Sequence, residues 1–344
     1  MPDTLIDVKD LKIHFFTDEG IVRAVDGTDL TIRRGKTIAL VGESGCGKSV
    51  ACRSLLQIVH PPGKIVSGEI LLTRSGEADR FETVDIAKLP SRGREIRGIR
   101  GKEISMIFQE PMSSLSPMYT VGNQIMENIL LHTQMTKPEA RALCVDLLGR
   151  VGIPKPERLV DEYPFRLSGG MCQRAMIAMA LSCHPTLLIA DEPTTALDVT
   201  TQANILDMML ALQRQENMTL LFITHDLGVV AEIADDVAVM YLGKIVEASD
   251  VDAIFHNPQH PYTQSLLQSI PKISVKREEL VPIKGIVPNP FRRPGGCPFH
   301  PRCPKAFAEC RTIIPAVTRL TENHTVQCLL FEDLTSRKAA EPIQ

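Results

Sequence analysis

The sequence predicts an α/β protein with a mostly parallel sheet and a phosphate-binding loop, and three observations support this prediction. An apolar run at residues 37–41 leads into a glycine-rich loop at 42–49, and a helical pattern follows at 50–56. Two further apolar runs, 186–190 and 219–224, lack alternation and are separated by an amphipathic helix pattern. Strands without alternation, separated by helices, indicate a parallel sheet covered on both faces.

The loop reads Gly-Glu-Ser-Gly-Cys-Gly-Lys-Ser and fits the GxxxxGK[ST] pattern. Its glycines permit backbone angles that let successive N–H groups turn toward phosphate oxygens, and the helix that follows adds the positive end of its dipole. Lys48 is expected to reach the β- and γ-phosphates, and Ser49 is expected to bind Mg²⁺. A chance glycine turn would match the fixed positions in roughly one chain in a hundred of this length. The predicted nucleotide-binding residues here are Gly42, Glu43, Ser44, Gly45, Cys46, Gly47, Lys48, Ser49 and Val50.

Composition places the chain among globular proteins. It has 344 residues, 44% hydrophobic and 23% charged, and a formal net charge of −3 that offers no general attraction to nucleic acid. No run of 18 apolar residues occurs, and the N-terminus lacks the pattern of a secretion signal. Five of the nine cysteines, which are scattered through the expected core, fit reduced thiols. We therefore expect a cytosolic location.

The segments around these runs suggest further parts of the fold. Alternating residues between 5 and 32 predict short antiparallel strands, with Asp26-Gly27 as one of the turns. Phe15 could stack on an adenine ring or could belong to the core. The mixed-charge segment 74–102 reads as a solvated loop, and residues 113–166 read as a helical insertion.

The C-terminal region differs in composition from the rest of the chain. Half of the 24 prolines lie after residue 255, which excludes long helices and central strands there. We expect a domain boundary near residue 256 and a disordered tail at 333–344.

Three predicted strands end on polar residues, which are Gln109, the pair Asp191-Glu192, and His225. Ligands of parallel α/β sheets bind at the carboxyl ends of strands. Asp191 is expected to hold Mg²⁺, Glu192 to polarise the attacking water, and His225 to align that water with the γ-phosphate. Each residue alone is more often an ordinary surface residue, but their ordered spacing favours a shared site.

A second glycine turn, formed by Ser168, Gly169 and Gly170, precedes another helix pattern. Two phosphate-binding turns on separate lobes of one chain cannot enclose the same nucleotide. A head-to-tail dimer is the simplest arrangement that uses both.

Taken together, these motifs have the order and spacing of the nucleotide-binding domain of ABC transporters, which residues 5–255 resemble. The motifs are the phosphate loop, Gln109, LSGGM, LLIADEP, ALD at 196–198 and ITHD at 223–226. More narrowly, the chain is similar to the ATPase subunits of bacterial oligopeptide and dipeptide importers, through MIFQEPMSSLSP at 106–117, NPQHPYTQSLL at 257–267 and the cysteine-bearing C-terminal segment.

The resemblance implies a P-loop NTPase with a RecA-like core, an antiparallel β-subdomain and a helical subdomain at about 110–170. These would make up a nucleotide-binding domain at 1–255, followed by a small irregular domain at 256–332 that carries four cysteines.

The resemblance also implies roles for single residues. Phe15 would stack on adenine, and Gln109 would bind Mg²⁺ with Ser49 and Asp191 and communicate with the membrane subunits. Glu192 and His225 would form the catalytic pair. Residues that would serve the dimer are Ser168, Gly169 and Gly170, which would contact the partner's γ-phosphate, and Asp198, which would cross the dimer seam. Cys172 replaces the Arg that many relatives carry.

The implied function is ATP hydrolysis that drives peptide import at the cytoplasmic face of the inner membrane. The partners would be a second ATPase subunit, two membrane permeases and, indirectly, an extracytoplasmic binding protein. Relatives import nickel, sugars or other solutes, so the cargo stays open, as does the choice between two identical and two distinct ATPase subunits. A soluble ABC ATPase acting on DNA or ribosomes is disfavoured, because only about 120 residues separate Ser49 from Gly169 and the chain holds one cassette.

Four cysteines, Cys297, Cys303, Cys310 and Cys328, lie within 32 residues, which indicates a shared site. Disulfides are disfavoured in a cytosol. Zinc remains open because His300 lies nearby, although CxxC pairs are absent. The resemblance favours a structural [4Fe–4S] cluster, which the same segment of the peptide-importer ATPases is known to carry.

Overall fold

The computed structural model describes residues 3–75, 80–110, 114–195, 198–269 and 283–333. Residues 111–113 of the MIFQEPMSSLSP motif, residues 196 and 197 of the ALD motif and nearly all of the predicted tail lie outside these ranges.

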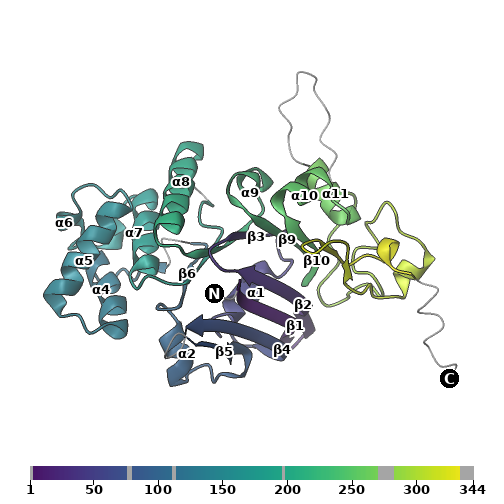
Figure 1. Cartoon of the computed structure of the whole chain (residues 1–344), viewed down its shortest axis with the longest axis horizontal. Helices are drawn as coiled ribbons and strands as arrows, with labels where there is room; N and C mark the ends of the chain where they lie inside the picture. The colour runs from purple at the N-terminus through teal and green to yellow at the C-terminus, as the bar shows by residue number, and fades with distance from the viewer. Residues whose placement is uncertain (1–2, 76–79, 111–113, 196–197, 270–282, 334–344) are drawn as a thin grey trace, which may run out of the picture.

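A mixed sheet forms the centre of the molecule (Figure 1). Within the described residues it has eight strands in the order β11-β12-β10-β9-β3-β8-β7-β6. The five strands from β9 to β6 run parallel, and β10 pairs antiparallel with β9, so the predicted parallel sheet is confirmed. The bounds are β3 Thr37–Val41, β6 Ile104–Ile107, β7 Leu187–Asp191, β8 Thr219–Thr224, β9 Asp236–Tyr241, β10 Lys244–Asp250, β11 Thr318–Arg319 and β12 Thr325–Val326.

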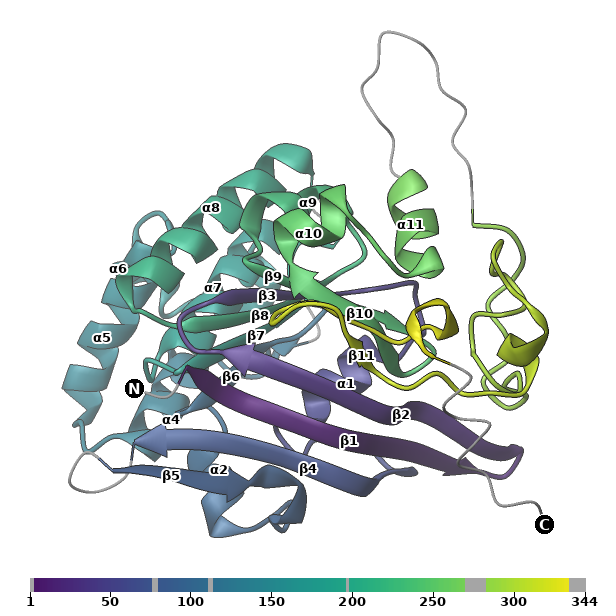
Figure 2. The same cartoon turned by 45° about the vertical axis from the view of Figure 1, so that its right-hand side comes forward.

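A second, antiparallel sheet packs below the central one in Figure 2, with the order β2-β1-β4-β5 in the described residues. Its strands are β1 Thr4–Thr17, β2 Gly20–Arg33, β4 Gly63–Ser75 and β5 Phe81–Asp85. The predicted turn at Asp26-Gly27 is wrong, because both residues lie inside β2, opposite register shifts in β1. The bulge lets one long strand continue where the pattern suggests two short ones.

Helices cover the central sheet and extend from it. Helices α4 to α7 form the group on the left of Figure 1; α4 to α6 lie within the expected helical insertion at 113–166, and α7 follows it. The helices are α1 Lys48–Ser54, α2 Arg94–Ile99, α4 Val121–His132, α5 Lys137–Arg150, α6 Pro156–Leu159, α7 Gly169–Leu181, α8 Val199–Gln215, α9 Leu227–Ile233, α10 Val251–His256 and α11 Pro261–Gln268. Among the described residues, none of these helices has the length and apolar character needed to cross a membrane.

The segment 74–102 differs from the predicted solvated loop. It contains the edge strand β5 and the helix α2, which are held together by Arg74 through ion pairs to Glu82, Glu95 and Glu103. The charges that suggested a loop therefore pair with one another across short elements.

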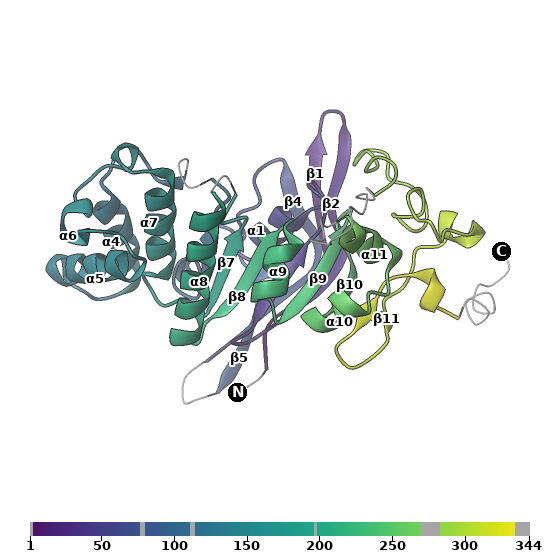
Figure 3. The same cartoon turned by 90° about the horizontal axis from the view of Figure 1, so that it is seen from above.

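The C-terminal segment 283–333 packs against the opposite end of the central sheet from the helical group (Figure 3). Strand β12 pairs with β10 and so extends the sheet. Phe299 and Leu329 share one hydrophobic cluster with Val239 and Tyr241 of β9. The boundary near residue 256 stays a prediction, but the segment that follows it shares its core with the sheet.

Candidate functional site

The phosphate-binding loop follows β3 and has little room for side chains. A Cβ atom on Gly42 would lie 2.2 Å from the Met240 carbonyl oxygen, and one on Gly47 would lie 2.3 Å from the Ala24 carbonyl oxygen. Both glycines also have positive φ angles, of 152° and 106°. Glycine is therefore required at both positions, and the loop is pressed between β2 and β9. Lys48 donates to the carbonyl oxygens of Gly42, at 2.8 Å, and Glu43, at 3.1 Å.

An open cavity of about 330 Å³ lies against this loop. It is lined by residues 44–50 of the loop and helix α1, by residues 22–24 of β2, and by Gln109, Glu192, Leu242, Pro290 and Arg293. Phe15 does not line the cavity, although Val22, its partner across the β1–β2 pair, does. The adenine-stacking role of Phe15 stays a prediction.

Asp191 ends β7 next to the loop and is fully buried. Ser49 Oγ donates to its Oδ1 at 2.9 Å, while its Oδ2 is buried without a hydrogen-bond partner among the described residues. Burial raises the pKa of the Asp191 carboxyl, and the bond from Ser49 opposes that shift. A buried oxygen without a donor, beside a hydroxyl, fits a site for a hard cation such as Mg²⁺.

Glu192 brings together residues from three strand ends. Gln109 Nε2 donates to Glu192 Oε2 at 3.0 Å, and His225 Nδ1 lies 3.3 Å from Glu192 Oε1. Thr195 Oγ1 also donates to Oε2, at 3.1 Å, a contact that the sequence alone did not indicate. Glu192 has a positive φ of 48°, a backbone strain that is common at functional sites.

The second glycine turn does not line the cavity of its own chain. Ser168 caps helix α7 by accepting a bond from the Met171 N–H, and Ser168 and Gly169 are exposed. Asp198 caps α8 in the same way and is also exposed. Cys172 is buried, and its thiol lies 3.5 Å from the Pro164 carbonyl oxygen. The turn and Asp198 are thus available to another molecule.

The cavity is also lined by Arg293 and Pro290 of the C-terminal segment, which lie more than 200 residues after the phosphate loop in the sequence. Arg293 pairs with Asp26 at 3.0 Å and donates to the carbonyl oxygens of Arg23 and Leu242. No motif predicts these contacts, because the residues that they join are far apart in the chain.

The four clustered cysteines line one narrow cavity together with His300 and Phe299. Burial raises the pKa of Cys297 to about 12 and that of Cys328 to about 11. Within the described ranges, no three His, Cys, Asp or Glu side chains surround a common position for a metal ion. The sequence therefore correctly brings the cysteines together, but the metal stays a prediction.

The loop, the buried carboxylate of Asp191 beside it and the Glu192 cluster define an ATPase of the P-loop class. Residues 25–195 match the family described as ABC transporter, and residues 246–310 match the family described as oligopeptide/dipeptide transporter, C-terminal region. The chain is 50% identical to the oligopeptide transport ATP-binding protein AppD of Bacillus subtilis, over 96% of this chain and 98% of that protein. It is 45% identical to the dipeptide transport ATP-binding protein DppD of Escherichia coli, over 94% and 96%.

Among solved structures, the chain resembles the dimeric bacterial ABC transporter cassette MJ0796, with a TM-score of 0.62 and 25% identity. The match covers 72% of this chain and 99% of that one. The chain belongs to the ABC ATPase family, within the group of oligopeptide and dipeptide transport ATP-binding proteins.

Proposed function

We propose that the chain hydrolyses ATP to drive the uptake of peptides, as a peripheral subunit at the cytoplasmic face of a transporter in the inner membrane. The observation that carries this proposal is that the phosphate loop and Glu192 line one cavity, where Ser49 donates to Asp191 and His225 lies against Glu192. The names of the AppD and DppD relatives support a peptide cargo. Nickel or sugar import would use the same site.

Each residue has a role that follows from its position. Lys48, released from its own carbonyl contacts, binds the β- and γ-phosphates. Ser49, Gln109 and Asp191 would hold Mg²⁺, which would supply positive charge to the phosphates. Glu192 orients a water molecule for attack, and His225, with its ring nitrogen 3.3 Å from Glu192, fixes the direction of that carboxylate.

A head-to-tail dimer completes the site. Ser168, Gly169 and Gly170 of one subunit would contact the γ-phosphate bound to the other, and Asp198 would cross the seam. Their exposure and the dimeric MJ0796 cassette support this arrangement. In this proposal the second ATPase subunit is an identical chain or a distinct homologue, and both subunits would dock on two membrane permeases that receive their cargo from an extracytoplasmic binding protein.

Glu192→Gln tests the proposal. We expect ATP turnover to fall on the order of 100-fold or more, because the carboxylate no longer polarises water. ATP affinity, measured by equilibrium titration, should stay within about threefold of wild type, since the phosphate loop is intact. Glu232→Gln, an exposed position on α9, is the matched control. Unchanged turnover in Glu192→Gln would remove Glu192 from its catalytic role.

We also propose that the cysteine cavity holds a [4Fe–4S] cluster, with zinc as the alternative. Four thiols line the cavity, the number of thiolates that such a cluster needs. In a cubane cluster each thiolate binds a different iron, so the sulfurs are spread around the group. The cluster would brace the proline-rich segment.

Iron and sulfide analysis of the purified chain, with an absorption spectrum, tests the cluster. We expect about four irons per chain in wild type and in Cys183→Ser, and loss of iron in Cys303→Ser. Stoichiometric zinc without iron would refute the cluster.

A further inference from the structure

The second residue of the phosphate loop, Glu43, is bound by the C-terminal segment. Arg302 donates through both terminal nitrogens, to Glu43 Oε2 at 2.6 Å and to Glu43 Oε1 at 2.9 Å. The Arg302 side chain is only 4% exposed and that of Glu43 is 25% exposed. This two-point geometry fixes both the distance and the direction of the carboxylate.

Arg302 is itself firmly held. Its Nε donates to the Lys284 carbonyl oxygen at 3.2 Å, and its guanidinium lies 5.9 Å from the centre of the Tyr241 ring. The pair with Glu43 raises the pKa of Arg302, so the guanidinium stays charged. Its backbone belongs to the turn 297–303, which carries two of the four clustered cysteines and is closed by a bond from Arg302 N–H to the Phe299 carbonyl oxygen. The position of the guanidinium therefore depends on how this turn is folded.

Glu43 is restrained on three sides. Besides the ion pair, its backbone N–H donates to the Tyr262 hydroxyl at 3.0 Å, and its carbonyl oxygen accepts from Lys48 Nζ at 3.1 Å. Glu43 does not line the nucleotide cavity, whereas Ser44 to Val50 do. The carboxylate thus serves the shape of the loop and not direct contact with a ligand.

We propose that Arg302 is a positioning residue for the phosphate-binding loop. Through Glu43 it holds the start of the loop in the shape that receives phosphate, so ATP affinity depends on the folded state of the cysteine-bearing turn. The inference rests on the proposed nucleotide site. Its physical basis is preorganisation, because a loop that is already held loses less freedom when the ligand binds.

A purely structural ion pair would lower stability without changing affinity, and the two roles can be separated. Full-length chains carrying Arg302→Gln, Arg302→Lys, Glu43→Gln and the double change Glu43→Gln/Arg302→Gln are titrated with ATP and Mg²⁺, and their thermal midpoints are recorded. Arg33→Gln is the matched control, because Arg33 forms a similar two-point pair, with Asp236, and does not line the cavity.

We expect Arg302→Gln and Glu43→Gln each to weaken ATP binding about tenfold, and the double variant to do no worse, because both changes remove one interaction. KM should rise by a similar factor while kcat stays within about threefold, since the catalytic residues are untouched. Arg302→Lys keeps the charge but loses the two-point contact with the carboxylate, so it should weaken ATP binding about threefold. Arg33→Gln should lower the thermal midpoint and leave Kd within about twofold.

A Kd within about twofold of wild type in a folded Arg302 or Glu43 variant would overturn the positioning role, as would effects that multiply in the double variant. If Arg302→Gln does not fold, Arg302→Lys and Glu43→Gln decide the question. Failure of the wild-type chain to bind ATP would instead refute the proposed function, and the positioning role with it.

Discussion

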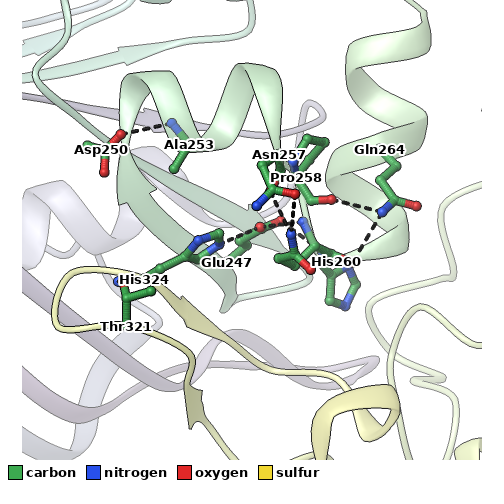
Figure 4. A network of polar contacts seen from close by, with 10 residues as sticks. Glu247, Asp250, Ala253, Asn257, Pro258, His260, Gln264, Thr321 and His324 are labelled. Atoms are coloured by element: carbon green, nitrogen blue, oxygen red, sulfur yellow. Dashed lines mark hydrogen bonds and ion pairs between the residues drawn. The ribbon is translucent and has the colours of Figure 1, made fainter.

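Two buried carboxylates, Asp191 beside the phosphate loop and Glu247 at the junction with the C-terminal segment, differ in how completely they are hydrogen-bonded. Asp191 has one partner, Ser49, and its Oδ2 has none among the described residues. Glu247 accepts from the N–H groups of Gln259 and His260 at 2.7 and 2.9 Å, and its Oε1 lies 2.8 Å from His324 Nε2 (Figure 4).

The difference separates a functional charge from a structural one. A buried charge is tolerated when donors satisfy it, and Glu247 draws its donors from the two residues before α11 and from His324, which precedes β12. It therefore ties the C-terminal segment to the sheet. Asp191 lacks that compensation, which a bound cation would supply. Incomplete hydrogen bonding at a buried acid thus points to a ligand, and complete hydrogen bonding points to a structural role.

Asp191→Asn gives the largest expected effect. Affinity for ATP with Mg²⁺ should fall on the order of 100-fold, because the cation loses a charged ligand. Since burial raises the pKa of Asp191 and so disfavours its charged form, the neutral side chain should stabilise the ligand-free chain by about 1 kcal/mol. Titration with and without Mg²⁺, and urea unfolding, measure both effects. A variant that is less stable than wild type and binds ATP with wild-type affinity would show that Asp191, like Glu247, has a structural role.

Glu247→Gln should do the opposite. The amide replaces one acceptor oxygen with a donor that faces N–H groups, so the free energy of unfolding should fall by about 2 kcal/mol. The affinity for ATP with Mg²⁺ should change less than about threefold, because Glu247 does not line the cavity. Chemical unfolding followed by circular dichroism gives the first value, with the exposed Glu232→Gln as control. Unchanged stability would mean that this junction does not depend on Glu247.

His260 gives an effect on stability that depends on pH. It is fully buried, and burial lowers its pKa from 6.5 to about 3. Between these values the unfolded chain binds one more proton, so stability should fall by about 1.4 kcal/mol for each pH unit as pH decreases. His260→Asn keeps an acceptor for the Tyr262 N–H that caps α11 and removes the titration. Between pH 6 and 4, the unfolding free energy of this variant should change by about 1.4 kcal/mol less per pH unit than that of wild type. Equal slopes in the two chains would contradict the assignment.

Local pattern is sufficient to predict some parts of this protein. The glycines of the phosphate loop are required by backbone contacts that the motif already encodes, and Asp191, Glu192 and His225 follow apolar strands that must lie side by side in a parallel sheet. The four cysteines are also correctly grouped. The predicted turn at Asp26-Gly27 is wrong. Asp and Gly occur both in turns and at β-bulges, and only the pairing of β1 with β2 shows which of the two forms here.

The sequence by itself therefore determined the class of the fold, the phosphate loop and the strand-end residues, since each depends on neighbours within a few positions. Only the tertiary structure decided that Arg302 holds Glu43, that Arg293 lines the nucleotide cavity and that Glu247 binds the C-terminal segment. These contacts join residues up to 270 positions apart, and no periodicity or spacing in the sequence records which of them will meet. They form when hydrophobic packing brings the C-terminal segment onto the end of the sheet, where the partners become neighbours.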